Sequence, residues 1–176
     1  MEVSVTIRAA RSSDSKGMGI VHVRAWQVAY RGVMTDDYLD GLNVEDRAAM
    51  WERAISAPAG PHVLVAAVGD EVIGFASFGV ERNQLDVSDV GQLYAINLDP
   101  THWGNGIGRL LLREATNSLR SMGFREAVLW VVTTNFRARS LYDSEGWTDD
   151  DAIRSEDVLG AIVQEMRYRY VLTLVV

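Results

Sequence analysis

Residues 103–108 read Trp103-Gly104-Asn105-Gly106-Ile107-Gly108 and run directly into Arg109-Leu110-Leu111-Leu112, and this stretch decides the fold of the 176-residue chain. Glycine at every second position leaves the backbone N–H groups of the turn uncovered by Cβ atoms. The helix that follows directs its positive end at the same N–H groups. The stretch therefore predicts a binding site for a diphosphate, with a helix-capping turn that binds nothing as the alternative.

The segments on either side of this turn have the pattern of strands. Residues 92–98 precede the turn and residues 126–132 follow the helix, and both runs are rich in apolar residues. Within the helix, apolar residues recur at four-residue spacing, at Ile107, Leu111, Ala115 and Leu119. A nicotinamide-binding fold is disfavoured, because its glycine turn should follow the first strand, with an acidic residue about twenty positions later.

The rest of the chain alternates between strand and helix patterns. Strands are expected at 3–7, 62–68 and 72–78, from 147 onward, and at 165–172, with a tight turn at Gly69-Asp70. Helices are expected from 12–14 to 30, at 36–39, at 48–55 and at 135–143. This order predicts an α+β fold, a mixed sheet with helices on both faces, in one domain spanning residues 1–176.

Composition excludes several classes of site. The chain has no cysteine, which rules out disulfides, thiolate metal ligands and a cysteine nucleophile, and no partner at ligand spacing accompanies His22, so no metal is expected. The net charge of −7 disfavours a nucleic-acid partner and is compatible with a cationic acceptor. Because neither a signal-peptide pattern nor an apolar run of membrane-spanning length is present, we expect a cytoplasmic protein with no membrane partner.

Two motifs, separated by the expected helix and strand, resemble those of the GCN5-related N-acetyltransferase (GNAT) family. The family's first motif is Arg/Gln-x-x-Gly-x-Gly/Ala; the glycines match here, but Trp103 replaces the Arg or Gln. The second is Asn-x-x-Ala-x-x-Leu/Phe-Tyr-x-x-x-Gly-Phe/Trp, which is matched in full at Asn135, Ala138, Leu141, Tyr142, Gly146 and Trp147. The resemblance covers most of the chain and is strongest from residue 92 to residue 147.

The resemblance implies a fold and a donor. It implies a twisted, mostly antiparallel sheet of six to seven strands, in which strands four and five splay apart and a bulge lies in strand four. It implies acetyl-CoA as the co-substrate, with the pantetheine arm and the thioester carbonyl near Ile96, Asn97 and Leu98. The diphosphate contacts then fall on the turn and the first helical residues: Gly104, Asn105, Gly106, Ile107, Gly108 and Arg109. For Arg109, a plain solvated arginine is the alternative.

The resemblance also implies direct attack of a primary amine in a ternary complex, with Tyr142 as the general acid that protonates the leaving thiolate. An aromatic anchor is the alternative for Tyr142. Asn135 either binds the pantetheine arm or caps its helix. Gln92 stands where relatives carry a glutamate base, so Glu81 is the nearest candidate base, unless it is a solvated loop carboxylate. A water, or an amine already neutral in a dry pocket, could replace a dedicated base.

The acceptor pocket is expected beneath the first helices. His22, Trp26, Tyr30 and Arg31 are the candidate acceptor contacts. The alternative for Trp26 and Tyr30 is core packing, and the alternative for His22 is a polar residue whose hydrogen bonds are satisfied. The acceptor is expected to be an amine of a small molecule or of a protein. A coenzyme A-binding sensor module without catalysis is the competing function. The apolar segment 171–176 suggests a homodimer.

Overall fold

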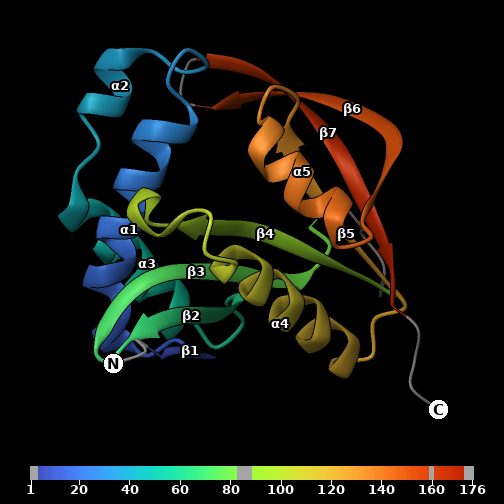
Figure 1. The fold of residues 1–176 in the computed structure, drawn as a ribbon, viewed down its shortest axis with the longest axis horizontal. Coiled ribbons are helices and arrows are strands. Elements are labelled where there is room, and N and C mark those ends of the chain that lie inside the picture. The colour runs from blue at the N-terminus through green and yellow to red at the C-terminus, as the bar shows by residue number, and fades with distance from the viewer. Residues whose placement is uncertain (1–3, 83–88, 159–160, 173–176) are drawn as a thin grey trace.

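The computed structural model describes residues 4–82, 89–158 and 161–172. Its seven strands form a single sheet in the order β1-β2-β3-β4-β5-β7-β6 (Figure 1). Neighbouring strands are antiparallel except for the parallel pair β4–β5. The strands are β1 Val5–Ala9, β2 His62–Val68, β3 Glu71–Val80, β4 Val90–Leu98, β5 Glu126–Val132, β6 Thr148–Val158 and β7 Ala161–Val171. The α-helices are α1 Ser15–Ala29, α2 Asp36–Asp40, α3 Val44–Ser56, α4 Ile107–Ser121 and α5 Phe136–Ser144.

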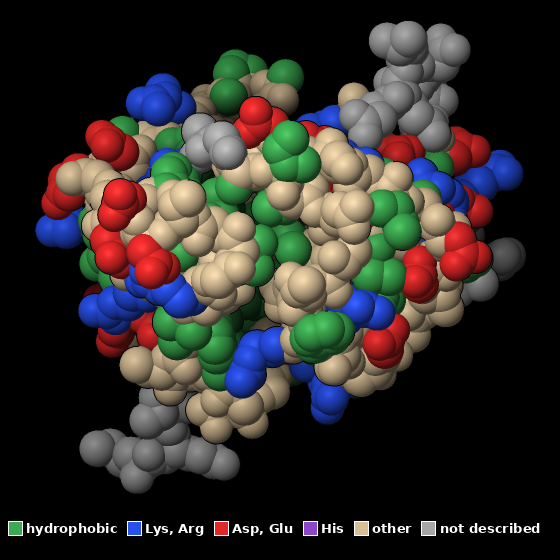
Figure 2. Space-filling view, turned by 90° about the horizontal axis from the view of Figure 1, so that it is seen from above, with side chains coloured by type: hydrophobic (Ala, Val, Ile, Leu, Met, Phe, Trp, Pro, Cys, Tyr) green, Lys and Arg blue, Asp and Glu red, His purple; other side chains and the backbone are tan. Residues whose placement is uncertain are grey.

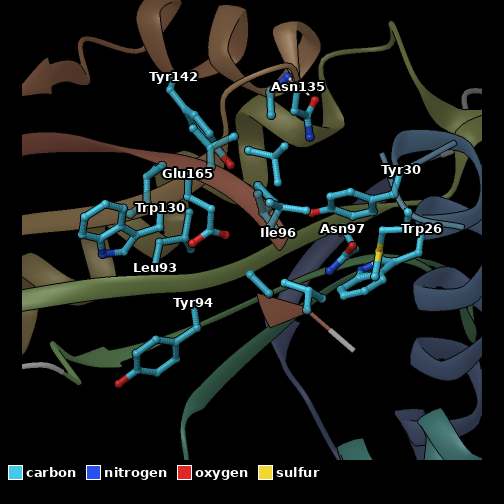
Figure 3. Close-up of a pocket in the computed structure, with 18 residues that line it drawn as sticks. Trp26, Tyr30, Leu93, Tyr94, Ile96, Asn97, Trp130, Asn135, Tyr142 and Glu165 are labelled. Carbon is cyan, nitrogen blue, oxygen red and sulfur yellow. Dashed lines mark hydrogen bonds between the residues drawn. The ribbon is translucent and has the colours of Figure 1, made fainter. Parts of the chain in front are cut away.

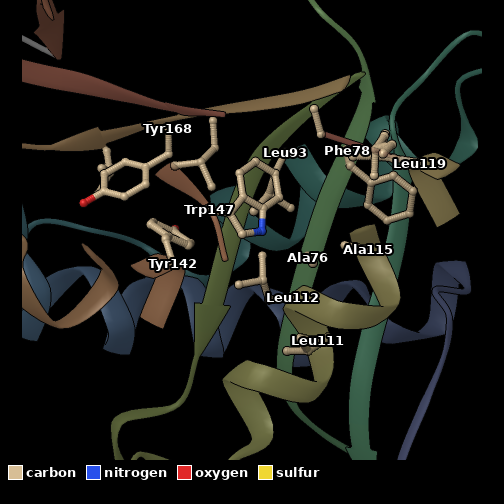
Figure 4. Packing of buried hydrophobic residues seen from close by; sticks show 14 of the residues in the cluster. Ala76, Phe78, Leu93, Leu111, Leu112, Ala115, Leu119, Tyr142, Trp147 and Tyr168 are labelled. Carbon is tan, nitrogen blue, oxygen red and sulfur yellow. The ribbon is translucent and has the colours of Figure 1, made fainter. Parts of the chain in front are cut away.

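Helices cover both faces of the sheet, as the sequence predicts. Val65 and Phe75 belong to the core cluster that includes Met18 of α1 and Trp51 of α3. Their neighbours along the strands belong to a second cluster, with residues of α4 and α5 (Figure 4). Because successive strand residues face opposite sides, β2 and β3 are apolar along most of their length and separate the two clusters. Figure 1 shows α4 and α5 on the same side of the sheet.

Strands β4 and β5 splay apart, which is the feature that positions the site. They pair only from Val90–Glu126 to Leu93–Leu129, although β4 continues to Leu98 and β5 to Val132. Just beyond Leu93, the pairing of β4 with β3 skips Tyr94, which forms a β-bulge. The expected splay and the expected bulge are both confirmed.

The C-terminal hairpin is longer than the sequence pattern predicts. Strand β7 begins at Ala161 rather than Glu165, and β6 includes an acidic run that does not have a strand pattern. Asp150 in this run is held by Arg167 at 2.8 Å and by Arg169 at 3.2 Å across the hairpin. Since Asp151 has a φ of 63°, the register breaks locally and resumes at Ile153.

Other boundaries shift by a few residues. Helix α3 begins at Val44 rather than at residue 48, because the Asn43 side chain accepts a hydrogen bond from the Asp46 N–H at 3.0 Å and caps it. Residues 83–88, which precede β4, and residues 173–176, most of the segment used to expect a homodimer, lie outside the described residues. Among the residues that are described, no helix combines the length and the apolarity needed to cross a bilayer.

Leu111 on α4 is completely buried, whereas Leu110 beside it is 46% exposed. We expect Leu111→Ala to lower the free energy of unfolding by about 2–5 kcal/mol, because it opens a cavity between α4 and the sheet. Leu110→Ala, the same change one residue away, should alter it by less than about 0.5 kcal/mol. Urea unfolding of both variants measures the difference, and equal losses would contradict the packing of α4 described above.

Candidate active site

The glycine turn before α4 has the geometry of an anion site. Gly104 and Gly106 have φ values of 81° and 78°, in the left-handed region that favours glycine. Gly106 is the N-cap of α4, and no side chain caps the helix there. The N–H groups at the start of the helix have no acceptor within the helix and remain available to a ligand.

This turn forms one end of a cavity of about 640 Å³. The cavity runs from the turn along the splayed end of β4 to α5, and Figure 2 shows a hollow lined with hydrophobic side chains between the α1–α2 end and the α5–β6 end of the molecule. The predicted donor-site residues that line it are Ile96, Asn97, Leu98, Gly104, Gly106, Ile107, Gly108, Arg109, Asn135 and Tyr142. Asn105 is exposed and is absent from the lining.

Trp103, the residue that departs from the family motif, has a structural role. Its Nε1 donates a hydrogen bond to the Leu98 carbonyl oxygen at 2.9 Å, which ties the turn to the end of β4. The Arg137 guanidinium lies 4.3 Å from the centre of its ring. Arg137 therefore places a cation beside the turn, whereas Arg109 is paired with Glu145 at 2.8 Å. The sequence offered no signal for Arg137, because it depends on a ring contact between distant elements.

A smaller cavity, of about 200 Å³, adjoins the larger one, and Figure 3 shows residues that line it. Its walls include residues of α1, β4, β5, α5, β6 and β7, and five of the lining residues are aromatic: Trp26, Tyr30, Tyr94, Trp130 and Tyr142. The two cavities share six lining residues, Tyr30, Ile96, Asn97, Asn135, Ala138 and Tyr142. A group held in one cavity can therefore meet a group held in the other at this shared wall.

Two tyrosine hydroxyls lie at the shared wall. Tyr142 is 5% exposed, and its hydroxyl is directed from α5 into the smaller cavity (Figure 3). Burial raises the pKa of Tyr142 well above its usual range, and the nearby Tyr30 and Tyr168 raise it further. Burial also raises the pKa of Tyr30 to about 12, with a smaller contribution from the Glu165 carboxylate. Both hydroxyls therefore keep their protons at neutral pH and can act as donors.

Asn135 caps α5, since its Oδ1 accepts a hydrogen bond from the Ala138 N–H at 3.2 Å. The predicted capping role is therefore confirmed. The same side chain lines both cavities, and its amide NH₂ group makes no hydrogen bond to a described residue. Binding of a ligand by that NH₂ group remains a prediction.

Glu81, the predicted base, requires a correction. On the β3–β4 pair, Gly74 lies opposite Leu98 at the site, whereas Val80 lies opposite Gly91 at the other end. Glu81 follows Val80, its N–H bonds the Val90 carbonyl at 3.1 Å, and it lines neither cavity. It is 6% exposed, so it is not a solvated loop carboxylate either. The register of β3 against β4 places Glu81 at the end of the strand pair that lies away from the site. The sequence pattern of a short strand does not specify that register.

The predicted acceptor contacts divide into two groups. Trp26 and Tyr30 line the smaller cavity. His22 is buried in the core, where its Nδ1 accepts a hydrogen bond from Trp51 Nε1 at 3.1 Å, and it lines neither cavity. Arg31 also lies outside both cavities, paired on the surface with Asp36 at 3.0 Å and Asp40 at 2.8 Å. His22 lies one turn before Trp26 on the same face of α1, with the two ring centres 4.8 Å apart, so its position along the helix separates it from the cavity, whereas Arg31 lies beyond the end of the helix.

The sequence analysis missed Glu165 and Trp130, which both line the smaller cavity. Glu165 is two residues from the buried Val163 on β7 and shares its face of the strand. A carboxylate on the buried face of a strand was the feature of the sequence that could have indicated this residue. It could not be recognised because the start of β7 was placed too late.

Comparison with known proteins agrees with this geometry. The acetyltransferase (GNAT) family matches residues 25–147. An uncharacterized N-acetyltransferase of Bacillus subtilis, YuaI, is 36% identical over 74% of this chain and 73% of its own length. A mycothiol acetyltransferase of Kocuria rhizophila is 36% identical over 49% of this chain, which spans only 29% of that protein. The PaiA N-acetyltransferase of Thermoplasma acidophilum, solved with coenzyme A, has the same fold, with a TM-score of 0.71 at 22% identity over 95% of this chain and 99% of its own.

The fold combines a mixed sheet, a parallel strand pair that splays apart, and a glycine turn at the start of a helix. Solved structures of acetyltransferases have the same fold. The chain belongs to the acetyltransferase (GNAT) family, whose co-substrate is acetyl-CoA.

The core position of His22 predicts a pH dependence of stability. Burial lowers its pKa to about 4 from an ordinary 6.5, and the Arg47 charge contributes. Below about pH 6.5 the unfolded chain binds a proton at this residue that the folded protein does not, so stability is lost as the pH falls toward 4. Between pH 7 and pH 5, protonation of this one group in the unfolded chain should lower the free energy of unfolding by about 2 kcal/mol.

Urea unfolding at both pH values tests the effect in the wild-type protein and in His22→Gln, which has no titrating group at this position. The wild type should lose more stability than the variant by the amount given above. An equal loss in both proteins would show that His22 titrates alike in the folded and unfolded states.

Proposed function

We propose that the two cavities divide an amine N-acetylation between them, with acetyl-CoA in the larger cavity and the acceptor amine in the smaller one. The shared wall carries this proposal, because the cavities adjoin only at the six residues that include Tyr142 and Asn97. Direct attack in a ternary complex requires such a junction, and holding both reactants there would supply much of the acceleration.

The larger cavity fits the donor. The unpaired N–H groups at the start of α4 suit the diphosphate, and Arg137 adds a positive charge beside it. Beyond Leu93, β4 has no pairing with β5, so the backbone from Ala95 to Asn97 can pair with the amides of the pantetheine arm. When bound, acetyl-CoA supplies an acetyl thioester, whose carbonyl carbon a neutral amine attacks.

Tyr142 is the residue we assign to proton transfer. Its hydroxyl lies at the shared wall, and its raised pKa keeps it protonated until negative charge develops on the leaving sulfur. As the C–N bond forms and the C–S bond breaks, the proton passes from Tyr142 Oη to the sulfur. The nitrogen gives up one proton as the amide forms, and that proton returns to the Tyr142 phenolate, so that coenzyme A leaves as the thiol and Tyr142 is restored.

A small-molecule acceptor fits better than a protein. Several relatives are named mycothiol acetyltransferases, and the acceptor cavity is small for a folded partner's side chain with its backbone.

Neither Glu81 nor Gln92 serves as a general base in this proposal. Glu81 lies at the end of β3 away from the site, and the side-chain oxygen of Gln92 already accepts a hydrogen bond from the Arg82 N–H at 3.1 Å.

The donor assignment predicts a ligand-dependent stabilisation. Acetyl-CoA at about a hundredfold over its dissociation constant should raise the free energy of unfolding by about 2.7 kcal/mol, and free coenzyme A should act similarly. Thermal unfolding with each ligand measures this, with NAD as the comparison. A shift with NAD alone, or with none of the three, would reject the donor site.

The acid assignment predicts the effect of one hydroxyl. Tyr142→Phe should lower kcat by about a hundredfold or more and leave the thermal shift with acetyl-CoA intact. Tyr170→Phe is the matched control, because Tyr170 packs on Trp147 and lines neither cavity. Release of coenzyme A thiol measures kcat. Unchanged turnover in Tyr142→Phe would show that Tyr142 is an aromatic anchor.

A further inference from the structure

The smaller cavity contains one charged group among its described lining residues, the carboxylate of Glu165. Glu165 lies on β7, with Val132 of β5 on one side and Arg154 of β6 on the other. Its side chain is 16% exposed, and the carboxylate points into the cavity near Leu93 and Ile96 (Figure 3). A carboxylate with so little exposure to solvent is stabilised by a cation or by hydrogen-bond donors.

The hydrogen bonds of Glu165 leave one oxygen available. Arg154 binds Oε2 through Nε at 2.7 Å and through NH2 at 2.7 Å, and Oε1 makes no hydrogen bond to a described residue. Arg154 is shared with Glu156 at 3.3 Å and lies 4.3 Å over the Trp130 ring. Two carboxylates therefore share one guanidinium, so this corner of the cavity carries one surplus negative charge.

The remaining walls combine aliphatic and aromatic side chains with two amide side chains, those of Asn97 and Asn135. Trp26 and Tyr30 pack against each other, with ring centres 4.8 Å apart, on the α1 side, and Val163 lies on the β7 side. A volume of about 200 Å³ is slightly larger than the roughly 150 Å³ that accommodates benzene in an apolar cavity. It is smaller than the roughly 300–1,000 Å³ typical of sites for larger ligands.

We propose that Glu165 is the residue that selects the acceptor, by holding the ammonium group of a compact primary amine with an apolar or aromatic body. This inference rests on the proposed function, because it takes the smaller cavity as the acceptor site. The ammonium would sit at Oε1, close to the shared wall, and the body would fill the aromatic part of the cavity. Because only the neutral amine attacks the thioester, the bound ammonium gives up one proton, to Glu165 Oε1 or to water, before the acetyl group is transferred.

This arrangement discriminates against other classes of amine. An α-amino acid adds a carboxylate that would be buried without a cation, since Arg154 does not line the cavity. A polyamine adds a second ammonium that would lie among aromatic side chains with no second carboxylate. A lysine peptide adds a backbone that exceeds the volume available.

The selectivity is tested with the 176-residue protein and acetyl-CoA, by release of coenzyme A thiol. We expect kcat/KM for 2-phenylethylamine to exceed that for phenylalanine, the same body with a carboxylate added, by at least about a hundredfold. Spermidine and a lysine-containing peptide should also be poorer substrates. A higher kcat/KM for phenylalanine, spermidine or the peptide would overturn the proposal.

The role of Glu165 is tested separately by binding. The dissociation constants of 2-phenylethylamine and 2-phenylethanol are measured on the coenzyme A complex of the wild type and of Glu165→Gln. The wild type should prefer the amine by about 10- to 100-fold, and Glu165→Gln should lose most of that preference while it binds the alcohol as before. The alcohol has nearly the same shape as the amine and carries no charge. Equal weakening of the binding of both ligands would therefore indicate a structural effect of the substitution and would overturn the proposal.

Glu156→Gln is the matched control. It removes the other carboxylate partner of Arg154, and with it the surplus charge, but it leaves Glu165 Oε1 and every lining residue of the cavity in place, so it should reduce the preference for the amine without abolishing it. Loss of the preference in Glu156→Gln as well would assign the selectivity to Arg154 and overturn the proposal for Glu165. If acetyl-CoA binds and no amine of any class is acetylated, the proposed function itself fails, an outcome distinct from acetylation of the wrong class.

Discussion

The parting of β4 from β5 is the constraint on which the rest of the site depends. Two parallel strands that pair only from Val90–Glu126 to Leu93–Leu129 leave the end of β4 without its neighbour on that side. Backbone N–H and C=O groups that would normally hydrogen-bond to the neighbouring strand are therefore available to a ligand. The bulge at Tyr94 marks the same point on the β3 side of the strand, and both cavities have walls on the freed segment. Helices α4 and α5, packed on one face, close the donor side.

Features of the fold and the site that depend on residues close together in the sequence could be predicted from it, and features that depend on residues far apart could not. The glycine turn, α4 and the capping of α5 by Asn135 are local, so residue type and spacing predicted them correctly. The position of Glu81 depends on strand register, and the length of β7 depends on ion pairs from Asp150 across a hairpin. Neither has a local signature. Glu165 was missed for the same reason, because an inward carboxylate is recognised only once the strand and its face are known.

Electrostatics differ between the two sides of the shared wall. The donor side offers backbone N–H groups at the start of α4 and the guanidinium of Arg137, which together attract an anion. The acceptor side offers a carboxylate that is only partly neutralised by Arg154. Between them lie tyrosine hydroxyls that burial keeps uncharged. Under the proposed assignment, the anionic donor and the cationic acceptor would therefore bind on opposite sides of these neutral hydroxyl groups.

The bond from Trp103 Nε1 to the Leu98 carbonyl joins the anion-binding turn to the strand that both cavities use. The donor half of the site is built mainly from backbone groups and such internal ties, which most side-chain substitutions leave unchanged. The acceptor half is built from side chains of α1, β5 and β7, each of which can change alone. Evolution of a new acceptor preference in this scaffold therefore needs few substitutions, and it can proceed while the supply of activated acetyl groups stays intact.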